Sequence, residues 1–329
     1  MDGVEYDPRK IVKSILLATL VIEGAGAFML SLLFKHAGVD DFWFAGIFHS
    51  VSAFCNAGFS LFPDSLEGFS TNLPVLVIIM VLICLGGLGF IVIKDLLQVV
   101  SRRYRYLTYH SKVVLGMTAL LILFGSITFF ILERRGAFAS FTTSQAVVNA
   151  LFQAVTPRTA GFDTVPQTLL RQPSKVLTLL LMFIGAGPGS IAGGIKVSTV
   201  FVILVMLFRT PDGQGDIAVR KRRISSETIH RATIYFLKAL LLLLSAAFLL
   251  SMIEGLHGKP FDAIVFEVVS AFGTVGLSLG LTDQLSVLGK VIIIITMFAG
   301  RVGLVALAFA SGRVKEYDIT YPEASVLLG

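Results

Sequence analysis

Three short segments of this chain repeat one order of residue types: a small polar residue, a small apolar residue, a glycine and a large apolar residue. They are Asn56-Ala57-Gly58-Phe59, Thr159-Ala160-Gly161-Phe162 and Thr274-Val275-Gly276-Leu277. Each follows a short helix-like run and precedes an apolar run long enough to cross a membrane. Non-helical backbone at membrane depth is tolerated only where it is buried in protein or lines a watery cavity. The pattern therefore predicts that these three glycine segments line a pore.

The glycine in the third place of each segment has a physical reason. A pore that strips water from K⁺ must offer successive main-chain carbonyl groups pointing at its axis, and such a backbone is easiest where no Cβ is present. Gly58, Gly161 and Gly276 stand where such a residue is needed. A tight turn between helices would explain any one of these glycines, but three copies in the same context favour the pore.

Composition separately indicates a membrane protein. Hydrophobic residues make up 55% and charged residues 15% of the 329 residues, with a mean hydropathy of +0.85, which is more apolar than a soluble domain of this size needs. The net charge of +6 would suit a nucleic-acid partner, but the basic residues cluster beside the apolar runs. Membrane topology explains that clustering better, so no nucleic acid is expected. Cys55 and Cys84 lie in apolar surroundings and do not suggest a disulfide scaffold.

The first unit, residues 1–110, contains an outer, a short and an inner apolar run. Residues 11–34 predict a retained transmembrane helix, in which Glu23 must face protein or water. Residues 42–54 are too short to cross a hydrocarbon core of about 30 Å, so they predict a half-membrane helix. Residues 74–93 predict an inner helix that returns across the membrane.

The second unit, residues 111–230, repeats the order with an outer helix over 113–132 and a short helix over 144–155. Its inner run, 175–208, is too long for one crossing of about 20 residues. A glycine-rich stretch interrupts it, containing Gly185, Gly187, Gly189, Gly193 and Gly194, together with Pro188. So many glycines and a proline predict a break in the helix. At that depth the broken backbone must face a pore or other protein.

The third unit, residues 231–329, has an outer helix over 232–253, a short helix from 261 or 262 to 272, and an inner helix over 287–309. Glu267 in the short helix either supports the adjacent segment by hydrogen bonding, which we favour, or contributes to cation preference. Arg301 lies near the middle of the inner helix, where an arginine must pair or meet water. Asp163, just beyond the second segment, either draws cations to a pore mouth or forms an exposed turn.

Basic residues collect in the gaps between the units. They are Lys94, Arg102, Arg103, Arg105 and Lys112 in the first gap, and Arg209, Arg220, Lys221, Arg222, Arg223 and Arg231 in the second. Positive loops favour the cytoplasmic side, which predicts six crossings, three half-helices and both termini in the cytoplasm of a plasma-membrane protein. Contacts of these residues with lipid headgroups or with a partner are secondary expectations.

Taken together, these motifs resemble the superfamily of K⁺ transporters that includes the Ktr, Trk and HKT proteins, and most closely the Ktr/Trk membrane subunit. In that family, four repeats of outer helix, pore helix, filter loop and inner helix surround one pore in one chain. The resemblance implies an all-α membrane protein of pseudo-symmetric repeats, with the three units matching the second, third and fourth. The first repeat is then expected to be absent, so that the chain is N-terminally truncated.

The resemblance also implies functional roles and partners. The glycine segments would be a K⁺ selectivity filter, and Gly185 to Gly194 would be a mobile gate whose ending is Gly193-Gly194-Ile195-Lys196. Arg301 would be a positive plug, with anchoring of neighbouring carbonyls as the open alternative. The implied protein is a K⁺ uptake subunit with no cofactor, and Na⁺ or proton coupling stays open. Its implied partners are a second copy in a homodimer and a cytosolic nucleotide-binding regulatory subunit of the RCK type.

The sequence leaves two rivals to a transport function, a membrane enzyme and a non-conducting subunit. A membrane enzyme is disfavoured, because the five histidines form no ligand-spaced cluster and no nucleophile constellation is present. Nucleotide binding by the glycine-rich stretch fails, because Ser190 stands where a dinucleotide fingerprint needs glycine and Ile195 separates Gly194 from Lys196. A non-conducting remnant that only assembles with other subunits is the second rival.

Overall fold

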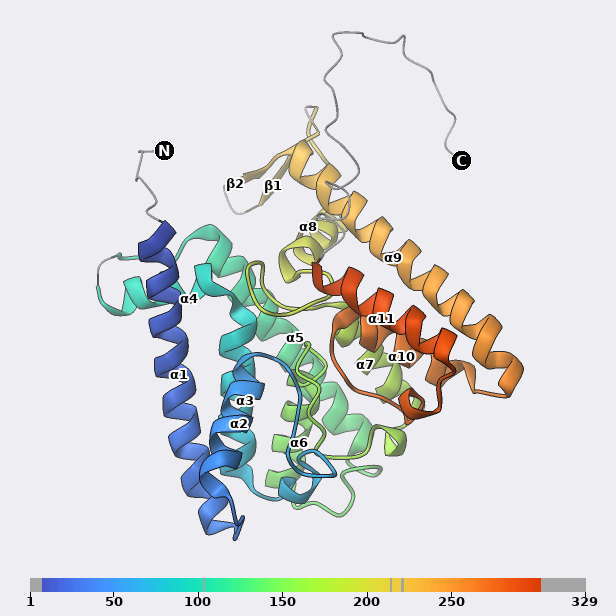
Figure 1. Cartoon of the computed structure of the whole chain (residues 1–329). Coiled ribbons are helices and arrows are strands. Elements are labelled where there is room, and N and C mark those ends of the chain that lie inside the picture. The colour runs from blue at the N-terminus through green and yellow to red at the C-terminus, as the bar shows by residue number, and fades with distance from the viewer. Residues whose placement is uncertain (1–7, 103, 214, 220–221, 303–329) are drawn as a thin grey trace.

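The computed structural model describes residues 8–102, 104–213, 215–219 and 222–302, which fold almost entirely into helices (Figure 1). The long helices α1 and α9 flank the molecule, and the short helices α2, α6 and α10 lie between them. One two-stranded antiparallel sheet is the only β-structure formed by named strands in these ranges. The fold class is therefore the expected all-α one.

In the first unit, α1 (Pro8–His36) packs against the short α2 (Phe42–Phe54). The prediction of one continuous inner helix over 74–93 is wrong. Instead α3 (Leu73–Leu88) ends at a glycine, and α4 (Phe90–Val100) leaves at an angle of 105°. The glycine is Gly89, with φ of +87°, a conformation that disfavours any side chain.

The second unit contains α5 (Tyr109–Glu133), α6 (Thr143–Val155), α7 (Gln172–Phe183) and α8 (Val197–Phe208). The inner apolar run is interrupted between α7 and α8. We call residues 185–194 in this interruption the glycine loop. A capping box starts α6, because the Thr142 hydroxyl accepts from the Gln145 N–H (3.4 Å) while the Gln145 side chain accepts from the Thr142 N–H (2.9 Å).

The third unit begins with an unforeseen hairpin of β1 (Ile217–Val219) and β2 (Arg222–Ile224). Then follow α9 (Ser226–Glu254), α10 (Phe261–Gly273) and α11, which is described over Val287–Val302. Helix α9 starts six residues earlier than expected because the Ser225 hydroxyl caps it, accepting from the Thr228 N–H at 3.3 Å. The expected continuation of the last inner helix to residue 309 lies outside the described residues. Four 3₁₀ turns complete the described elements: η1 (Glu67–Phe69), η2 (Gln167–Leu169), η3 (Gly255–His257) and η4 (Thr282–Gln284).

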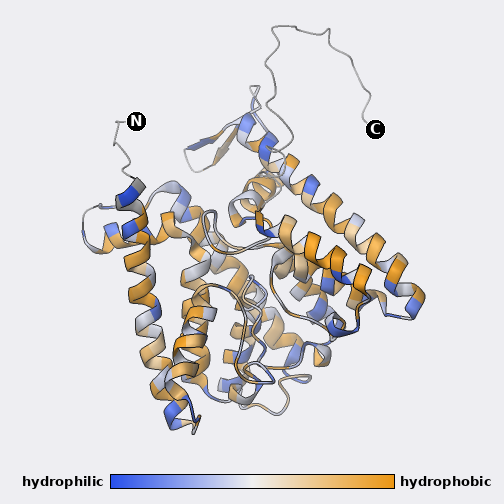
Figure 2. Ribbon diagram, in the orientation of Figure 1, coloured by the Kyte–Doolittle hydropathy of each residue, from blue (hydrophilic) through white to orange (hydrophobic). Residues whose placement is uncertain are grey.

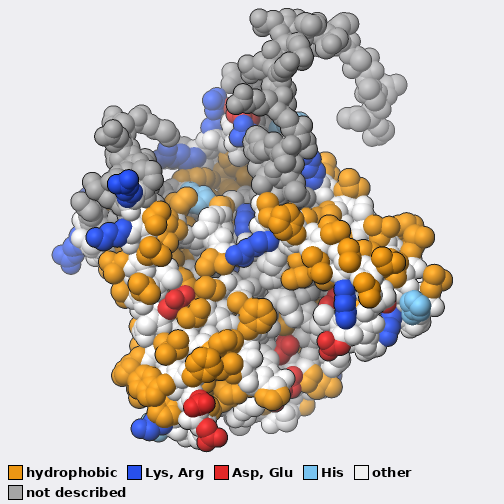
Figure 3. Space-filling view, in the orientation of Figure 1, with side chains coloured by type: hydrophobic (Ala, Val, Ile, Leu, Met, Phe, Trp, Pro, Cys, Tyr) orange, Lys and Arg blue, Asp and Glu red, His pale blue; other side chains and the backbone are white. Residues whose placement is uncertain are grey.

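The surface is that of a membrane protein. Helices Val12–His36, Tyr109–Glu133 and Ser226–His257 are long and apolar enough to cross a bilayer, and the bent pair α3 and α4 makes a fourth candidate span. Apolar residues cover most of the outer helices (Figure 2) and the face shown in Figure 3. On that face Lys and Arg gather toward the end where α1 and α9 begin. The full count of six crossings stays a prediction.

The short helices form the buried layer of the molecule. Phe152 of α6 and Phe266 of α10 are fully buried, as is Ala53 of α2. Close approach of helices uses glycine, because a methyl group at Gly86 of α3 would overlap the carbonyl oxygen of Phe54 at the end of α2. Gly300 of α11 makes the same contact with Phe272 at the end of α10. The ends of the short helices are thus fixed against the inner helices.

Candidate functional site

Each glycine segment begins within four residues of the end of one of the short helices, and the three share a backbone pattern. The first residue and the glycine of each segment have positive φ. The values are 49° and 72° for Asn56 and Gly58, 72° and 83° for Thr159 and Gly161, and 50° and 95° for Thr274 and Gly276. Left-handed backbone at a non-glycine residue is uncommon. Its recurrence at one position shows that the three segments are built alike.

The structure brings the glycine segments together. A methyl group at Gly58 would overlap the carbonyl oxygen of Ala160, and one at Gly161 would overlap the carbonyl oxygen of Val275. The first segment therefore abuts the second, and the second abuts the third. Gly276 differs, because a methyl group there would meet no described atom within 4 Å.

Hydroxyl groups near the ends of the short helices hold the segments in shape. Ser52 Oγ donates to the carbonyl of Phe59 (2.8 Å), and Thr156 Oγ1 donates to the carbonyl of Phe162 (2.6 Å). In the third copy, Ser270 Oγ accepts from the N–H of Gly276 (3.2 Å). Each segment is therefore anchored to its own helix by a small polar side chain.

Main-chain carbonyls of the segments are left without partners. Within the described ranges, nine carbonyl oxygens accept no hydrogen bond: those of residues 56–58, 159–161 and 274–276. Main-chain carbonyl groups are strong acceptors that are paired with protein or water in folded chains, so this set of oxygens is free to bind a ligand or water. Rings of such oxygens can replace the hydration shell of a K⁺ ion.

The glycine loop packs directly against the third segment. A methyl group at Gly193 would overlap the Thr274 hydroxyl and come within 2.9 Å of the carbonyl oxygen of Gly273. The ends of the loop are tied by a backbone bridge between Ile184 and Ile195, where the Gly185 N–H donates to the carbonyl of Ile195 (2.9 Å). The loop therefore joins α7 to α8 without a helix.

The other side of the glycine loop contacts the bend between α3 and α4. The Gly187 N–H donates to the carbonyl of Gly87 (2.9 Å), and the Phe90 N–H donates to the carbonyl of Gly189 (3.3 Å). A Cβ at Gly89 would lie 2.5 Å from the carbonyl oxygen of Pro188. The two interrupted inner helices thus meet at their interruptions.

Two cationic residues lie at the end of the glycine loop. Lys196 Nζ donates to the carbonyl of Ala192. Arg301 of α11 lines a cavity of about 220 Å³ together with Gly194 and Lys196. The structure therefore places Arg301 beside the loop.

Arg158 is a further buried cation, and the sequence analysis assigned it no role. Its guanidinium donates to the carbonyl of Thr118 (3.3 Å), the hydroxyl of Thr118 (3.4 Å) and the carbonyl of Gly185 (3.3 Å). Arg158 directly precedes the second segment, so it connects that segment to the glycine loop. The available signal was a charged residue in an otherwise uncharged, apolar stretch.

Two acidic side chains make hydrogen bonds close to the glycine segments in the chain. Glu267 accepts hydrogen bonds from the hydroxyls of Ser278 (2.8 Å) and Thr282, so it braces the chain that follows the third segment. Asp163 accepts from the Gln167 amide at 2.6 Å. Burial raises the pKa of Asp163 to about 7, against the lowering effect of the Gln167 hydrogen bond, and the nearby Glu67 raises it further.

The sequence is similar to those of known transport proteins. The TrkH family, described as cation transport protein, matches residues 2–316. The potassium/sodium uptake protein NtpJ of Enterococcus hirae is 39% identical over 327 residues, covering 97% of this chain and 72% of NtpJ. Ktr system potassium uptake protein B of Bacillus subtilis is 38% identical over 322 residues, covering 97% of this chain and 71% of that protein.

A solved structure has the same fold. The crystal structure of the potassium transporter TrkH from Vibrio parahaemolyticus matches with a TM-score of 0.75, covering 94% of this chain and 66% of that chain. Sequence identity over the match is 20%, so this likeness shows the arrangement of helices.

Proposed function

Because this chain belongs to the TrkH family of cation transport proteins, we propose that it is the pore-forming membrane subunit of a potassium uptake system. The observation that carries the proposal is the set of nine unpaired main-chain carbonyls on three adjoining segments. The relative from E. hirae is named a potassium/sodium uptake protein, and the relative from B. subtilis a potassium uptake protein.

In this proposal the glycine segments are the selectivity filter. Its members are Asn56, Ala57, Gly58, Phe59, Thr159, Ala160, Gly161, Phe162, Thr274, Val275, Gly276 and Leu277. A K⁺ ion exchanges its hydration shell for their carbonyl oxygens, and no protein carboxylate has to bind it directly. The helices α2, α6 and α10 end at the segments, so the partial negative charge of three helix C-termini lies beside the ion.

The glycine loop, Lys196 and Arg301 form the gate of the proposed pore. The loop lies against Thr274 at the start of the third segment. In this proposal it obstructs the path of an ion at that point. The charges of Lys196 and Arg301 repel a cation that has passed the filter. Glycines 185, 187, 189, 193 and 194 supply the backbone freedom that a rearrangement of the loop requires. Conduction then needs the loop and Arg301 to move aside together.

The wider organisation is proposed on the same basis. Residues 1–110, 111–230 and 231–329 form three pore repeats in a plasma membrane, with both termini in the cytoplasm. The chain works as a homodimer with a cytosolic nucleotide-binding regulatory subunit. It is not an enzyme and carries no cofactor, and K⁺ is its cargo.

A second candidate function is that of an assembly subunit that does not conduct by itself. The observation in its favour is the open space beside Gly276, because the series of contacts between segments does not continue past the third one in the described residues. Such a subunit would depend on other polypeptide for a complete pore.

One experiment separates these functions. The chain is produced in cells that lack their own K⁺ uptake systems, and growth at low K⁺ and uptake of Rb⁺ and Na⁺ are measured. Restored growth supports the pore, and absent growth with the protein present in the membrane supports the assembly subunit. Gly276→Ser should then change the Rb⁺ to Na⁺ ratio. Gly280→Ser is the matched control, because Gly280 also has positive φ (84°) and open space around it but lies outside the filter.

A further inference from the structure

A cavity of about 690 Å³ lies away from the proposed pore, at the N-terminal end of α5. Residues of α8 and of the hairpin of β1 and β2 complete its wall. Its lining residues include Tyr109, Lys112, Gly116 and Leu120 of α5, and Val219 and Arg222 of the hairpin. We propose that this cavity binds one anionic phospholipid, with the phosphate between Lys112 and Arg222 and an acyl chain against the apolar wall.

The apolar part of the cavity continues onto the outer surface of α5. From Leu120, which is 56% exposed, a stripe of exposed apolar residues runs along the helix at spacings of three and four. It comprises Leu120, Leu123, Phe124, Ile127 and Ile131. On a helix that is long and apolar enough to span a bilayer, such a stripe contacts acyl chains. An acyl chain that follows this stripe therefore ends in the cavity.

The charge of the cavity suits a phosphate. Lys112 and Arg222 line it, no acidic residue does, and within the described ranges neither cation makes an ion pair. The Asp95 carboxylate lies nearby, but it accepts from the N–H (2.8 Å) and hydroxyl (2.9 Å) of Thr108 and is not part of the lining. Tyr109 also lines the cavity, and its buried hydroxyl has no hydrogen-bond partner among the described residues.

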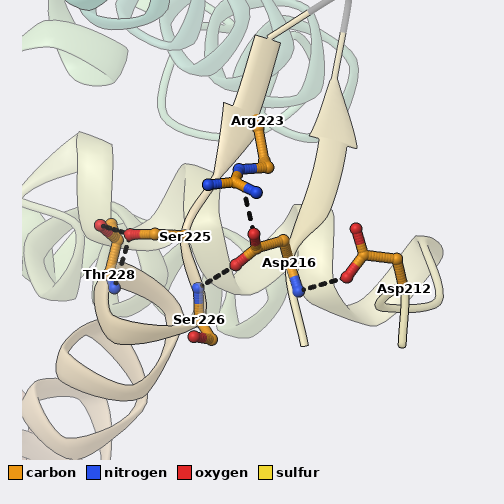
Figure 4. A network of polar contacts seen from close by, with 6 residues as sticks. All are labelled: Asp212, Asp216, Arg223, Ser225, Ser226 and Thr228. Atoms are coloured by element: carbon orange, nitrogen blue, oxygen red, sulfur yellow. Dashed lines mark hydrogen bonds and ion pairs between the residues drawn. The ribbon is translucent and has the colours of Figure 1, made fainter. Parts of the chain in front are cut away.

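The hairpin holds Arg222 at the cavity. Val219 and Arg222 are paired in the sheet, and both line the cavity. The next residue, Arg223, contacts Asp216 instead (3.0 Å), as alternation along a strand requires (Figure 4). Asp216 also accepts from the Ser226 N–H at the start of α9 (2.7 Å), which fixes the hairpin to that helix (Figure 4).

An anionic lipid fits this combination better than a soluble anion does. Basic residues beside a membrane span attract anionic headgroups, whereas a soluble phosphate would leave the apolar wall and the adjoining stripe unused. The proposal rests on the membrane location of the chain and not on ion conduction. Its test therefore measures lipid retention, which can fail or succeed separately from potassium uptake.

The test is native mass spectrometry of the full chain, purified in detergent and mixed with phosphatidylglycerol or phosphatidylcholine at equal concentrations. We expect one retained phosphatidylglycerol per chain and roughly tenfold weaker retention in the double variant Lys112→Gln/Arg222→Gln. The control, Arg134→Gln/Arg135→Gln, removes two cations just beyond the other end of α5 and should retain lipid as wild type does. Equal retention of both lipids by the wild type, or unchanged retention in the double variant, would overturn the proposal.

A second variant tests the apolar wall. A Cβ at Gly116 would meet no described atom within 4 Å, so Gly116→Leu starts its side chain in open space and extends it into the cavity. It should abolish phosphatidylglycerol retention without lowering the melting temperature. Gly24→Leu, at another helical glycine with open surroundings, is its matched control. Wild-type retention by Gly116→Leu, or displacement of the lipid by millimolar inorganic phosphate, would contradict binding of an acyl chain here.

Discussion

The hydroxyl group of Thr274 lies against the α-carbon of Gly193, so the glycine loop and the third glycine segment are in direct contact. A side chain at position 193 must displace either the glycine loop or the third glycine segment. The contact therefore couples the part of the chain that we assign to the gate to the part that we assign to the filter.

We predict that Gly193→Ala destabilises the protein and raises its basal potassium uptake. The added methyl group overlaps the Thr274 hydroxyl, and overpacking of this kind costs about 1–3 kcal/mol. Thr274→Ala in the same chain should recover part of the melting temperature, because it removes both side-chain atoms that the methyl group meets first. Additive effects of the two substitutions would show that the contact is not the cause.

Replacing Gly58 by alanine should destabilise the protein more than replacing Gly276 by alanine does. Both residues have positive φ, so each substitution carries backbone strain of about 1 kcal/mol. Only at Gly58 does the methyl group also overlap a carbonyl oxygen, that of Ala160. We expect Gly58→Ala to lower the melting temperature clearly more than Gly276→Ala does. Equal losses would contradict the contact between the first and second segments.

The free energy of unfolding should fall as the pH rises from about 4 to 7, because folded Asp163 holds its proton in this range. Burial raises the pKa of Asp163 to about 7, above its ordinary value of about 4, so in this window the folded state holds a proton that the unfolded state has released. Unfolding is then favoured as pH rises, and the loss levels off above pH 7. Asp163→Asn keeps an acceptor for Gln167 and should flatten this slope in melting temperature.

The neighbouring carboxylate provides a second arm of the same pH experiment. Glu67 contributes to the raised pKa of Asp163, so Glu67→Gln should move the midpoint of the slope to lower pH. An unchanged slope in Asp163→Asn would assign the pH dependence to other groups.

Arg158→Met should destabilise the protein and disturb uptake together. The substitution leaves the buried carbonyl group of Gly185 without its donor, and a buried unsatisfied group costs about 1–3 kcal/mol. Arg158→Lys restores the charge but cannot span the same set of acceptors, so we expect only partial recovery of the melting temperature and of Rb⁺ uptake. Full recovery by lysine would show that charge alone is needed.

Much of the fold follows from apolar run length and glycine position. The short helix predicted over 42–54 is α2 (Phe42–Phe54), and α6 and α10 each lie within a residue or so of their predicted bounds. These helices could be predicted because a run of about 13 apolar residues followed by a glycine segment excludes a full crossing. The roles of the filter and gate residues stay predictions.

Other features depend on contacts that the local sequence does not encode. The bend at Gly89 fits against Pro188, about 100 residues later, and an apolar run with three glycines gives little sign of it. The abutment of Gly58 on Ala160 is likewise a contact between separate units. The bond from Arg158 to the carbonyl of Gly185 lies within the second unit but joins residues 27 positions apart. The hairpin over 217–224 was hidden in a basic segment that reads as a solvated loop.

The paired interruptions of the inner helices have a mechanical consequence. The Phe90 N–H at the start of α4 donates to the carbonyl of Gly189, and the carbonyl of Gly87 in α3 accepts from Gly187. A displacement of α4 must therefore move the glycine loop or break the bond to Gly189. The first residue of α4, Phe90, is bonded to the glycine loop, and the other end of the helix, Val100, leads to the basic residues that follow it. A displacement of the far end of α4 would therefore reach the glycine loop through the backbone of this helix.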